Sequence, residues 1–249
     1  VAYLDGDNSN KITVMKYDGT AWVVVGAAGF SAGQASYNSL ALDSADMPYL
    51  AYMDGANGNK ATVMKYDGSA WMTVGGAGFS ASNANYTSLA LDSAGTPYLA
   101  YQDAGNNYKA TVMKYNGSVW VTVGAEGFSA GSASYTSLAL DSAGTPFVAY
   151  QDYVNSNKAT VMKYDGSNWV TLGVAGFSAG QTVYSSLALD STGTPFVAYK
   201  DYGNSSRATV MSLGEATTTL SGTPTNTDVG DHSIDLVVSD GTTTVAQSF

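Results

Sequence analysis

The chain has 249 residues, of which 45% are hydrophobic and only 12% charged, and its formal net charge is −10. This hydrophobic content is enough for a sizeable core, and the negative charge argues against nucleic acids and anionic membranes as partners, because phosphates would be repelled. Cysteine is absent and His232 is the only histidine, so disulfides, thiolate nucleophiles and metal sites built on several histidines are excluded. No apolar run is long enough to span a bilayer, so we predict no membrane insertion.

One sequence unit recurs along the chain. Trp22, Trp71, Trp120 and Trp169 are spaced by 49 residues, and the residues around each tryptophan are nearly the same. A period of about 40–50 residues, built from short strand-like segments, is typical of radial or linear β repeats. Helical periodicity is absent, so the sequence predicts an all-β fold.

A complete unit carries four strand signals, rich in β-branched and aromatic residues and bounded by Gly, Asp, Asn or Pro. The first and second are Ser88–Asp92 and Pro97–Asp103, and the third and fourth, in the preceding copy, are Lys60–Tyr66 and Trp71–Gly75. The links DSAGTP and YDGSAW have hairpin turn chemistry, whereas the link from the fourth strand to the next unit is long. A four-stranded antiparallel meander followed by a longer crossing predicts a β-propeller blade.

The number of strands predicts the size of the ring. Residues 1–26 contain the second, third and fourth strands of a blade, three complete units follow, and the first three strands of a last blade end near Met211. We therefore predict a five-bladed β-propeller of four-stranded antiparallel blades, with the repeats in residues 1–212. The segment 213–249 has the length to supply the two missing strands, at Thr217–Leu220 and at residues 233–239. Closing the ring in this way would remove two unpaired strand edges.

The C-terminal segment has a second interpretation. Residues 220–225, 228–230 and 238–241 resemble the second half of the Ig-like, cadherin-like modules that occur in tandem in bacterial surface proteins. Half of such a sandwich cannot bury a core alone, so the segment either closes the propeller or is the stump of a following domain. The repeat itself is similar to propeller repeats of large secreted bacterial proteins, and it lacks the signature motifs of the WD40, kelch and sialidase families.

Two sets of repeated residues are candidates for ligand binding. All five copies keep the spacing D-x-x-N-x-x-K/R between the second and third strands, and four copies keep an aromatic pair in the long link. Loops at these two places share one face of a propeller, whereas the opposite face carries only tight turns. The candidate polar residues are Asp54, Asn57, Lys60, Asp103, Asn106, Lys109, Asp152, Asn155 and Lys158. The candidate aromatic residues are Phe79, Phe128, Phe177, Tyr86, Tyr135 and Tyr184.

The same residues allow a purely structural interpretation. In the functional interpretation, an aromatic face stacks on a sugar or an apolar group, and Asp, Asn and Lys give directional hydrogen bonds. In the structural one, Asp and Asn satisfy the turn backbone, Lys pairs with Asp, and Phe and Tyr fill the gap between blades. Repetition within one chain does not separate the two, since duplication keeps both kinds of residue.

Three classes of function follow. The first is a multivalent, secreted or cell-surface binding module for a glycan or a surface protein, in which repeated weak sites give avidity. The second is a structural spacer or surface-assembly protein without a small ligand. The third is a glycoside hydrolase, which needs two carboxylates in different environments, whereas near-identical blades place carboxylates in identical environments. The binding module is the prediction, with no catalytic residue, metal site or cofactor.

Overall fold

The computed structural model describes residues 1–214, 235–239 and 244–248. The chain divides into two compact units, residues 1–214 and 215–249. Within the described residues, no helix combines the length and the apolar character needed to cross a bilayer.

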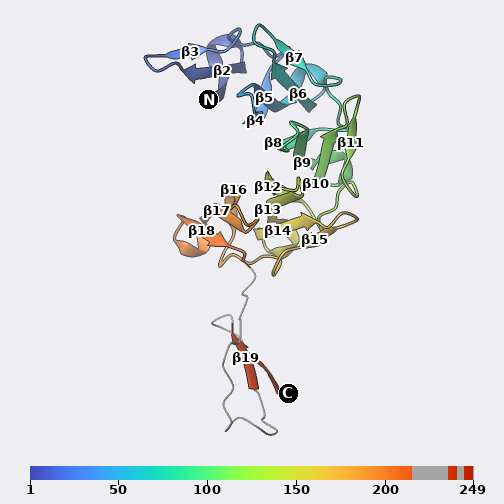
Figure 1. The fold of residues 1–249 in the computed structure, drawn as a ribbon, viewed down its shortest axis with the longest axis vertical. Coiled ribbons are helices and arrows are strands. Elements are labelled where there is room, and N and C mark those ends of the chain that lie inside the picture. Colours follow the sequence, from blue (N-terminus) through green and yellow to red (C-terminus); the bar gives the residue numbers. More distant parts are fainter. Residues whose placement is uncertain (215–234, 240–243, 249) are drawn as a thin grey trace, which may run out of the picture. The chain divides into compact units, whose positions relative to one another are not determined.

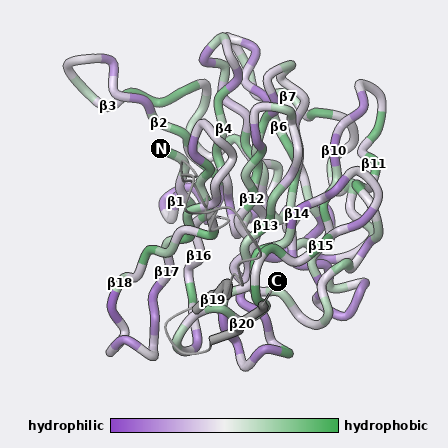
Figure 2. Tube along the Cα trace, turned by 60° about the horizontal axis from the view of Figure 1, so that its bottom comes forward, coloured by the Kyte–Doolittle hydropathy of each residue, from purple (hydrophilic) through white to green (hydrophobic). Residues whose placement is uncertain are grey.

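The first unit is an all-β, five-bladed propeller of antiparallel blades. Blades 2, 3 and 4 have four strands each, and blades 1 and 5 have three each in the described residues. The blades follow one another along an arc, with β4, β8, β12 and β16 on its inner side and β7, β11 and β15 on its outer side (Figure 1). Turns such as the one between β17 and β18 are hydrophilic (Figure 2). The strands of this unit are β1 (Ala2–Asp5), β2 (Lys11–Tyr17) and β3 (Trp22–Val24) in blade 1; β4 (Ala35–Leu42), β5 (Pro48–Asp54), β6 (Lys60–Tyr66) and β7 (Trp71–Thr73) in blade 2; β8 (Ala84–Leu91), β9 (Pro97–Asp103), β10 (Lys109–Tyr115) and β11 (Trp120–Thr122) in blade 3; β12 (Ala133–Leu140), β13 (Pro146–Asp152), β14 (Lys158–Tyr164) and β15 (Trp169–Thr171) in blade 4; and β16 (Thr182–Leu189), β17 (Pro195–Asp201) and β18 (Arg207–Ser212) in blade 5.

The strands agree closely with the sequence prediction. The second and third strands of a blade have the predicted bounds, as in β9 and β6. The first strand is longer than predicted, because residues before its serine continue the pairing with the second strand. The fourth strand is shorter and ends at Thr73 in β7. As the order of signals predicted, blade 1 consists of second, third and fourth strands, and blade 5 of first, second and third strands.

A short 3₁₀ helix joins the second and third strands of every blade. Each begins after the aspartate that ends the second strand, and the residue that follows it has a left-handed backbone, with φ of 68° at Gly58 and 55° at Asn107. Gly and Asn adopt this conformation most readily. These helices are η1 (Gly6–Asn8), η2 (Gly55–Asn57), η3 (Ala104–Asn106), η4 (Tyr153–Asn155) and η5 (Tyr202–Asn204).

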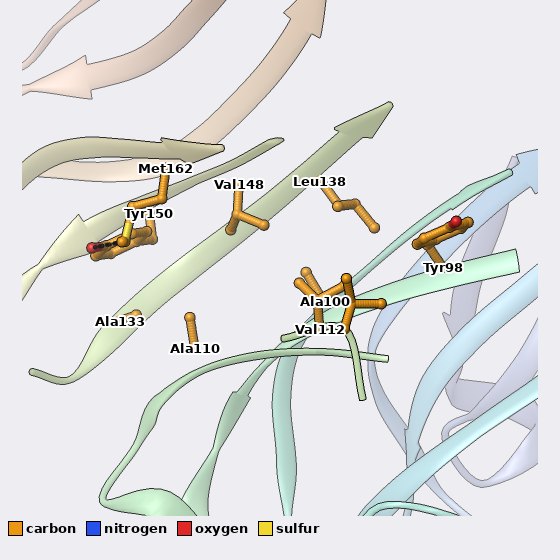
Figure 3. Packing of buried hydrophobic residues seen from close by; sticks show 10 residues of the cluster. Tyr98, Ala100, Ala110, Val112, Ala133, Leu138, Val148, Tyr150 and Met162 are labelled. Carbon is orange, nitrogen blue, oxygen red and sulfur yellow. Dashed lines mark hydrogen bonds between the residues drawn. The ribbon is translucent and has the colours of Figure 1, made fainter. Parts of the chain in front are cut away.

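The hydrophobic core lies between neighbouring blades. One cluster joins blades 3 and 4 and includes Tyr98, Val112, Val148 and Tyr150 (Figure 3). The Tyr150 hydroxyl donates to the Met162 sulfur at 3.3 Å. Similar clusters lie at the other three junctions, so each blade is stabilised mainly by its neighbours.

A tryptophan completes three of these junctions. The Trp120 ring stacks on Phe79 of the preceding blade with centroids 4.3 Å apart, and its Nε1 donates to the Val74 carbonyl at 2.8 Å. Trp71 and Trp169 make the corresponding contacts. Trp22 in blade 1 is instead 55% exposed.

The second unit contains the strands β19 (Asp235–Ser239) and β20 (Thr244–Ser248), which pair with each other in a two-stranded antiparallel sheet. The expected fourth strand at residues 217–220 lies outside the described residues. That residues 213–249 close the ring, or that they are the stump of an Ig-like domain, stays a prediction.

Candidate ligand-binding sites

The predicted aspartates hold the turns of one end of the blades. One carboxylate oxygen of Asp103 accepts from the backbone N–H of Gly105 at 3.0 Å, and the other accepts from Asn106 Nδ2 at 2.8 Å and from Thr111 Oγ1 at 3.1 Å. In blades 2 and 4, one oxygen of the equivalent aspartate likewise accepts from an asparagine Nδ2 and a threonine Oγ1. Each carboxylate is therefore enclosed by its own turn and the strand that follows it. The three aspartates, all 1% exposed, are Asp54, Asp103 and Asp152.

The predicted asparagines and lysines lie nearer the surface. Lys109 stands directly opposite Asp103 in the antiparallel pair of β10 and β9, and its copies stand opposite Asp54 and Asp152. The structural interpretation expected these lysines to pair with the aspartates, but within residues 1–214 no ion pair joins them. The half-buried side chains of this group are Asn57, Asn106, Asn155, Lys60, Lys109 and Lys158.

The structure brings the asparagine turns and the Gly-Phe-Ser loops together, as predicted. A Cβ on Gly78 would lie 2.8 Å from the Cβ of Asn57, and the Gly78 N–H donates to Thr62 at 2.9 Å. Phe79 and Phe128 are half-buried and turn one ring face to a tryptophan of the next blade. Phe177 instead meets Tyr199 edge-on, with centroids 6.3 Å apart.

The predicted tyrosines lie on the innermost strands. Tyr86, Tyr135 and Tyr184 belong to β8, β12 and β16, at the bulge where the register with the second strand shifts. Their rings form a row with Tyr37 of β4, and neighbouring centroids are 4.7 to 5.2 Å apart. The tyrosines thus form a row of their own near the start of the innermost strands.

Three hollows lie at the opposite end of the blades, where only tight turns were predicted from the sequence. A cleft of about 720 Å³ lies between blades 2 and 3, and one of about 480 Å³ lies between blades 3 and 4. Every residue that lines the second cleft stands 49 positions after a residue that lines the first. A third cleft, of about 790 Å³, lies between blades 1 and 2.

These clefts combine polar and apolar groups. The first is lined by Lys65, Asp92, Thr96, Lys114 and Asn116 beside Met72, which is 56% exposed. The Lys114 ammonium lies 5.9 Å from the centroid of the Tyr98 ring, and in the next cleft Lys163 lies 5.0 Å from that of Phe147. Ammonium, carboxylate, hydroxyl and amide groups around an apolar side chain are the mixture that polar ligands need.

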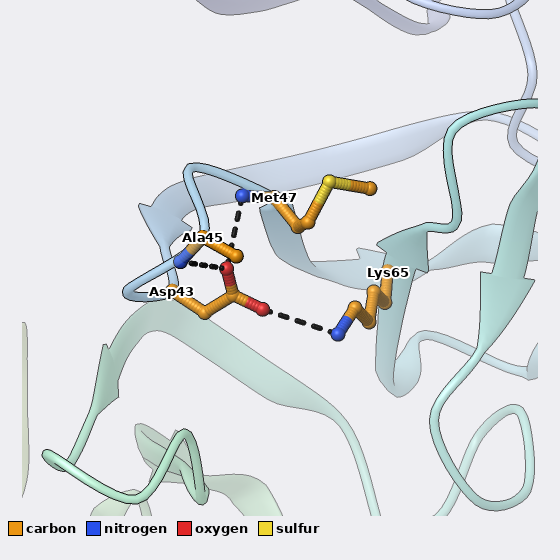
Figure 4. A network of polar contacts seen from close by, with 4 residues as sticks. All are labelled: Asp43, Ala45, Met47 and Lys65. Atoms are coloured by element: carbon orange, nitrogen blue, oxygen red, sulfur yellow. Dashed lines mark hydrogen bonds and ion pairs between the residues drawn. The ribbon is translucent and has the colours of Figure 1, made fainter.

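Lys65 is held more firmly than its copies. Its Nζ lies 3.1 Å from an oxygen of Asp43 and 4.8 Å from the centroid of the Tyr49 ring. The other Asp43 oxygen accepts from the backbone N–H groups of Ala45 and Met47, both at 3.0 Å (Figure 4). Contacts with Tyr49 and then Asp43 raise the pKa of Lys65. The Met47 N–H contributes most to the lowered pKa of Asp43.

Sequence reasoning missed these clefts because each is built from the turns of two neighbouring blades. A usable signal was present, since Lys16, Lys65, Lys114 and Lys163 repeat at 49-residue spacing in the third strands. A metal site is not indicated: no cluster of three or more His, Cys, Asp or Glu side chains suited to a metal ion occurs in the described part of the chain.

No family model and no curated protein sequence matches this chain. Solved structures do resemble it. The SapL1 lectin in complex with α-methyl fucoside has a TM-score of 0.60 and 16% identity, over 84% of this chain and 70% of that chain. The Aleuria aurantia lectin in complex with Fucα1-6GlcNAc has a TM-score of 0.58 and 16% identity, over 84% of this chain and 69% of that chain. An endo-1,4-β-xylanase from Bacteroides thetaiotaomicron has a TM-score of 0.51 and 14% identity, over 85% of this chain and 90% of that chain. Identities this low show a shared propeller fold and nothing about activity.

Proposed function

We propose that this protein is a multivalent glycan-binding module of a secreted or cell-surface protein, without catalytic activity. The observation that carries the proposal is the repetition of one cleft between successive blades, with the same lining positions 49 residues apart. Two similar folds are lectins solved with fucosides, which supports a glycan as the ligand class.

The chemistry of the clefts suits a neutral sugar. Lysine and asparagine donate hydrogen bonds, Asp92 and Thr96 accept them, and Met72 offers an apolar surface for the C–H groups of a pyranose ring. The mixture of charges in each cleft and the net charge of −10 disfavour strongly anionic ligands. Each cleft is open, so single sites should be weak and affinity should come from several sites acting together.

The residues predicted from the sequence stay a second candidate site for the same function. Asn57, Asn106 and Asn155 and the neighbouring lysines lie at the other end of the blades and also recur in every complete blade. A glycan could bind there through side chains that the buried aspartates hold in place. Variants of the two ends separate the alternatives.

The direct test is a glycan array read at several printing densities, with neutral and anionic glycans. We expect the signal from neutral glycans to increase more than in proportion to the printing density, because several sites of one molecule bind neighbouring glycans at the same time. A chain that binds no glycan at any density and no cell surface would instead favour the structural spacer. Release of sugars from a soluble polysaccharide would favour the hydrolase, a class represented among the similar folds by the xylanase.

A further inference from the structure

The row of tyrosines on the innermost strands has an unusual backbone. Tyr37, Tyr86, Tyr135 and Tyr184 have φ values of 51°, 50°, 53° and 58°. A bulky side chain rarely adopts a positive φ, because its Cβ crowds the neighbouring carbonyl. Backbone strain of this kind concentrates at ligand sites, and all four copies keep it although the residues on either side of the tyrosine vary.

The row is continuous and fixed between blades. Ring centroids of successive tyrosines are 4.7, 4.7 and 5.2 Å apart. The hydroxyls of Thr87 and Thr136 donate to the carbonyls of Tyr37 and Tyr86 in the preceding blade. The backbone N–H of Leu138 also donates to Ser88 Oγ across the same junction at 2.9 Å. The aromatic surface is therefore preorganised.

The tyrosines line a shallow hollow of about 200 Å³ whose other lining residues are Asn38, Thr87, Thr136 and Ser185. All of these side chains are uncharged. The Ser185 hydroxyl is buried and has no hydrogen-bond partner in the described residues, whereas its counterparts Thr87 and Thr136 each have one. The hollow is smaller than the sites of drug-sized ligands.

The electrostatics of the row favour a cation. The faces of aromatic rings carry a negative potential that attracts ammonium groups, and no lining cation opposes it. Burial and then the neighbouring tyrosines raise the pKa of Tyr86, so its ring stays a neutral phenol. The net charge of −10 adds a long-range attraction for cations.

We propose that the tyrosine row is a second binding site that takes a small quaternary ammonium group, separate from the clefts between blades. The rings would contact the methyl groups of the cation. Choline is a probe of this class.

The test compares choline with its neutral isostere 3,3-dimethylbutan-1-ol by calorimetric titration at constant ionic strength. The two have the same shape and differ in charge, so we expect choline to bind about tenfold more tightly. Equal affinities for the two probes, or no binding of choline, would overturn the proposal. This comparison uses the unaltered protein, so it does not depend on a variant that folds.

Variants then locate the site. Tyr135→Phe keeps the ring and should change the choline affinity less than about threefold, whereas Tyr135→Leu should lower it about tenfold. Tyr153→Leu is the matched control, since Tyr153 lies on η4 and is 67% exposed, and it should leave binding unchanged. Choline that binds equally well to Tyr135→Leu, once its fold is confirmed by circular dichroism, would contradict the assignment. Choline should not compete with a glycan held in the clefts, so either proposal can fail alone.

Discussion

At the scale of single residues, a repeated aspartate can either stabilise a turn or bind a ligand. A variant of Asp103 separates these two roles. This aspartate is 1% exposed and accepts two hydrogen bonds from its own turn and one from Thr111 on the next strand. Asp103→Ala would leave these donors without a partner, so we expect a loss of about 3 kcal/mol in the free energy of unfolding, measured in urea. If the variant keeps its stability and loses glycan binding, Asp103 is a ligand residue and the functional interpretation of the sequence is right.

A second prediction concerns the tight turn between the third and fourth strands, where one copy has changed naturally. Asp67 accepts from two backbone N–H groups, both at 2.8 Å, and Asn116 accepts from the corresponding two at 3.0 Å. The backbone bonds lower the pKa of Asp67 and Asp165, and they lower the pKa of Asp18 to about 2. Because these carboxylates have lower pKa values in the folded state, their stabilisation is present above the ordinary value of 3.8 and is lost as the pH falls toward about 2.

The triple variant Asp18→Asn/Asp67→Asn/Asp165→Asn copies the natural Asn116 turn. We expect a melting temperature near that of the wild type at neutral pH, and a smaller fall on acidification through this window. Thermal melts followed by circular dichroism measure both. An acid-induced fall as large as that of the wild type would show that these turns do not contribute to the pH dependence.

At the scale of elements, the junction between blades carries the stability. Trp120 is 8% exposed, stacks on Phe79 and donates to a carbonyl of the preceding blade. Trp120→Ala should therefore cost about 3–5 kcal/mol in the free energy of unfolding. Trp22→Ala is the matched control and should cost about 1 kcal/mol or less, since Trp22 is 55% exposed. A loss at Trp22 as large as at Trp120 would show that another segment covers it, as closure of the ring requires.

The positions of most strands could be predicted from the sequence. Strands such as Pro97–Asp103 are rich in aromatic and aliphatic residues and end at turn residues, so their bounds agree with the structure. The positive φ of Tyr86 could not be predicted, because a bulky side chain rarely adopts this conformation. Asp54 and its copies also accept hydrogen bonds from Thr62 and its equivalents on the next strand, and this contact was not predicted from the sequence.

At the scale of the whole molecule, repetition decides which functions are possible. Each cleft is lined by residues from two neighbouring blades. Its lining residues can therefore be identified only when the turns of both blades are seen next to each other. The sequence therefore predicted the fold, whereas the class of function stays a proposal. The five-bladed, all-β architecture was confirmed, whereas the residues that contact a ligand stay a proposal.

The most direct test of that proposal compares the two ends of the blades on the densest glycan surface that the wild type binds. The triple variant Lys65→Ala/Lys114→Ala/Lys163→Ala alters the clefts, and Asn57→Ala/Asn106→Ala/Asn155→Ala alters the opposite end. We expect the lysine variant to lose at least about tenfold in apparent affinity, because each weakened site reduces the avidity, and the asparagine variant to keep wild-type binding if its melting temperature is unchanged. Loss of binding in the folded asparagine variant, with full binding in the lysine variant, would contradict the assignment of the glycan site to the clefts.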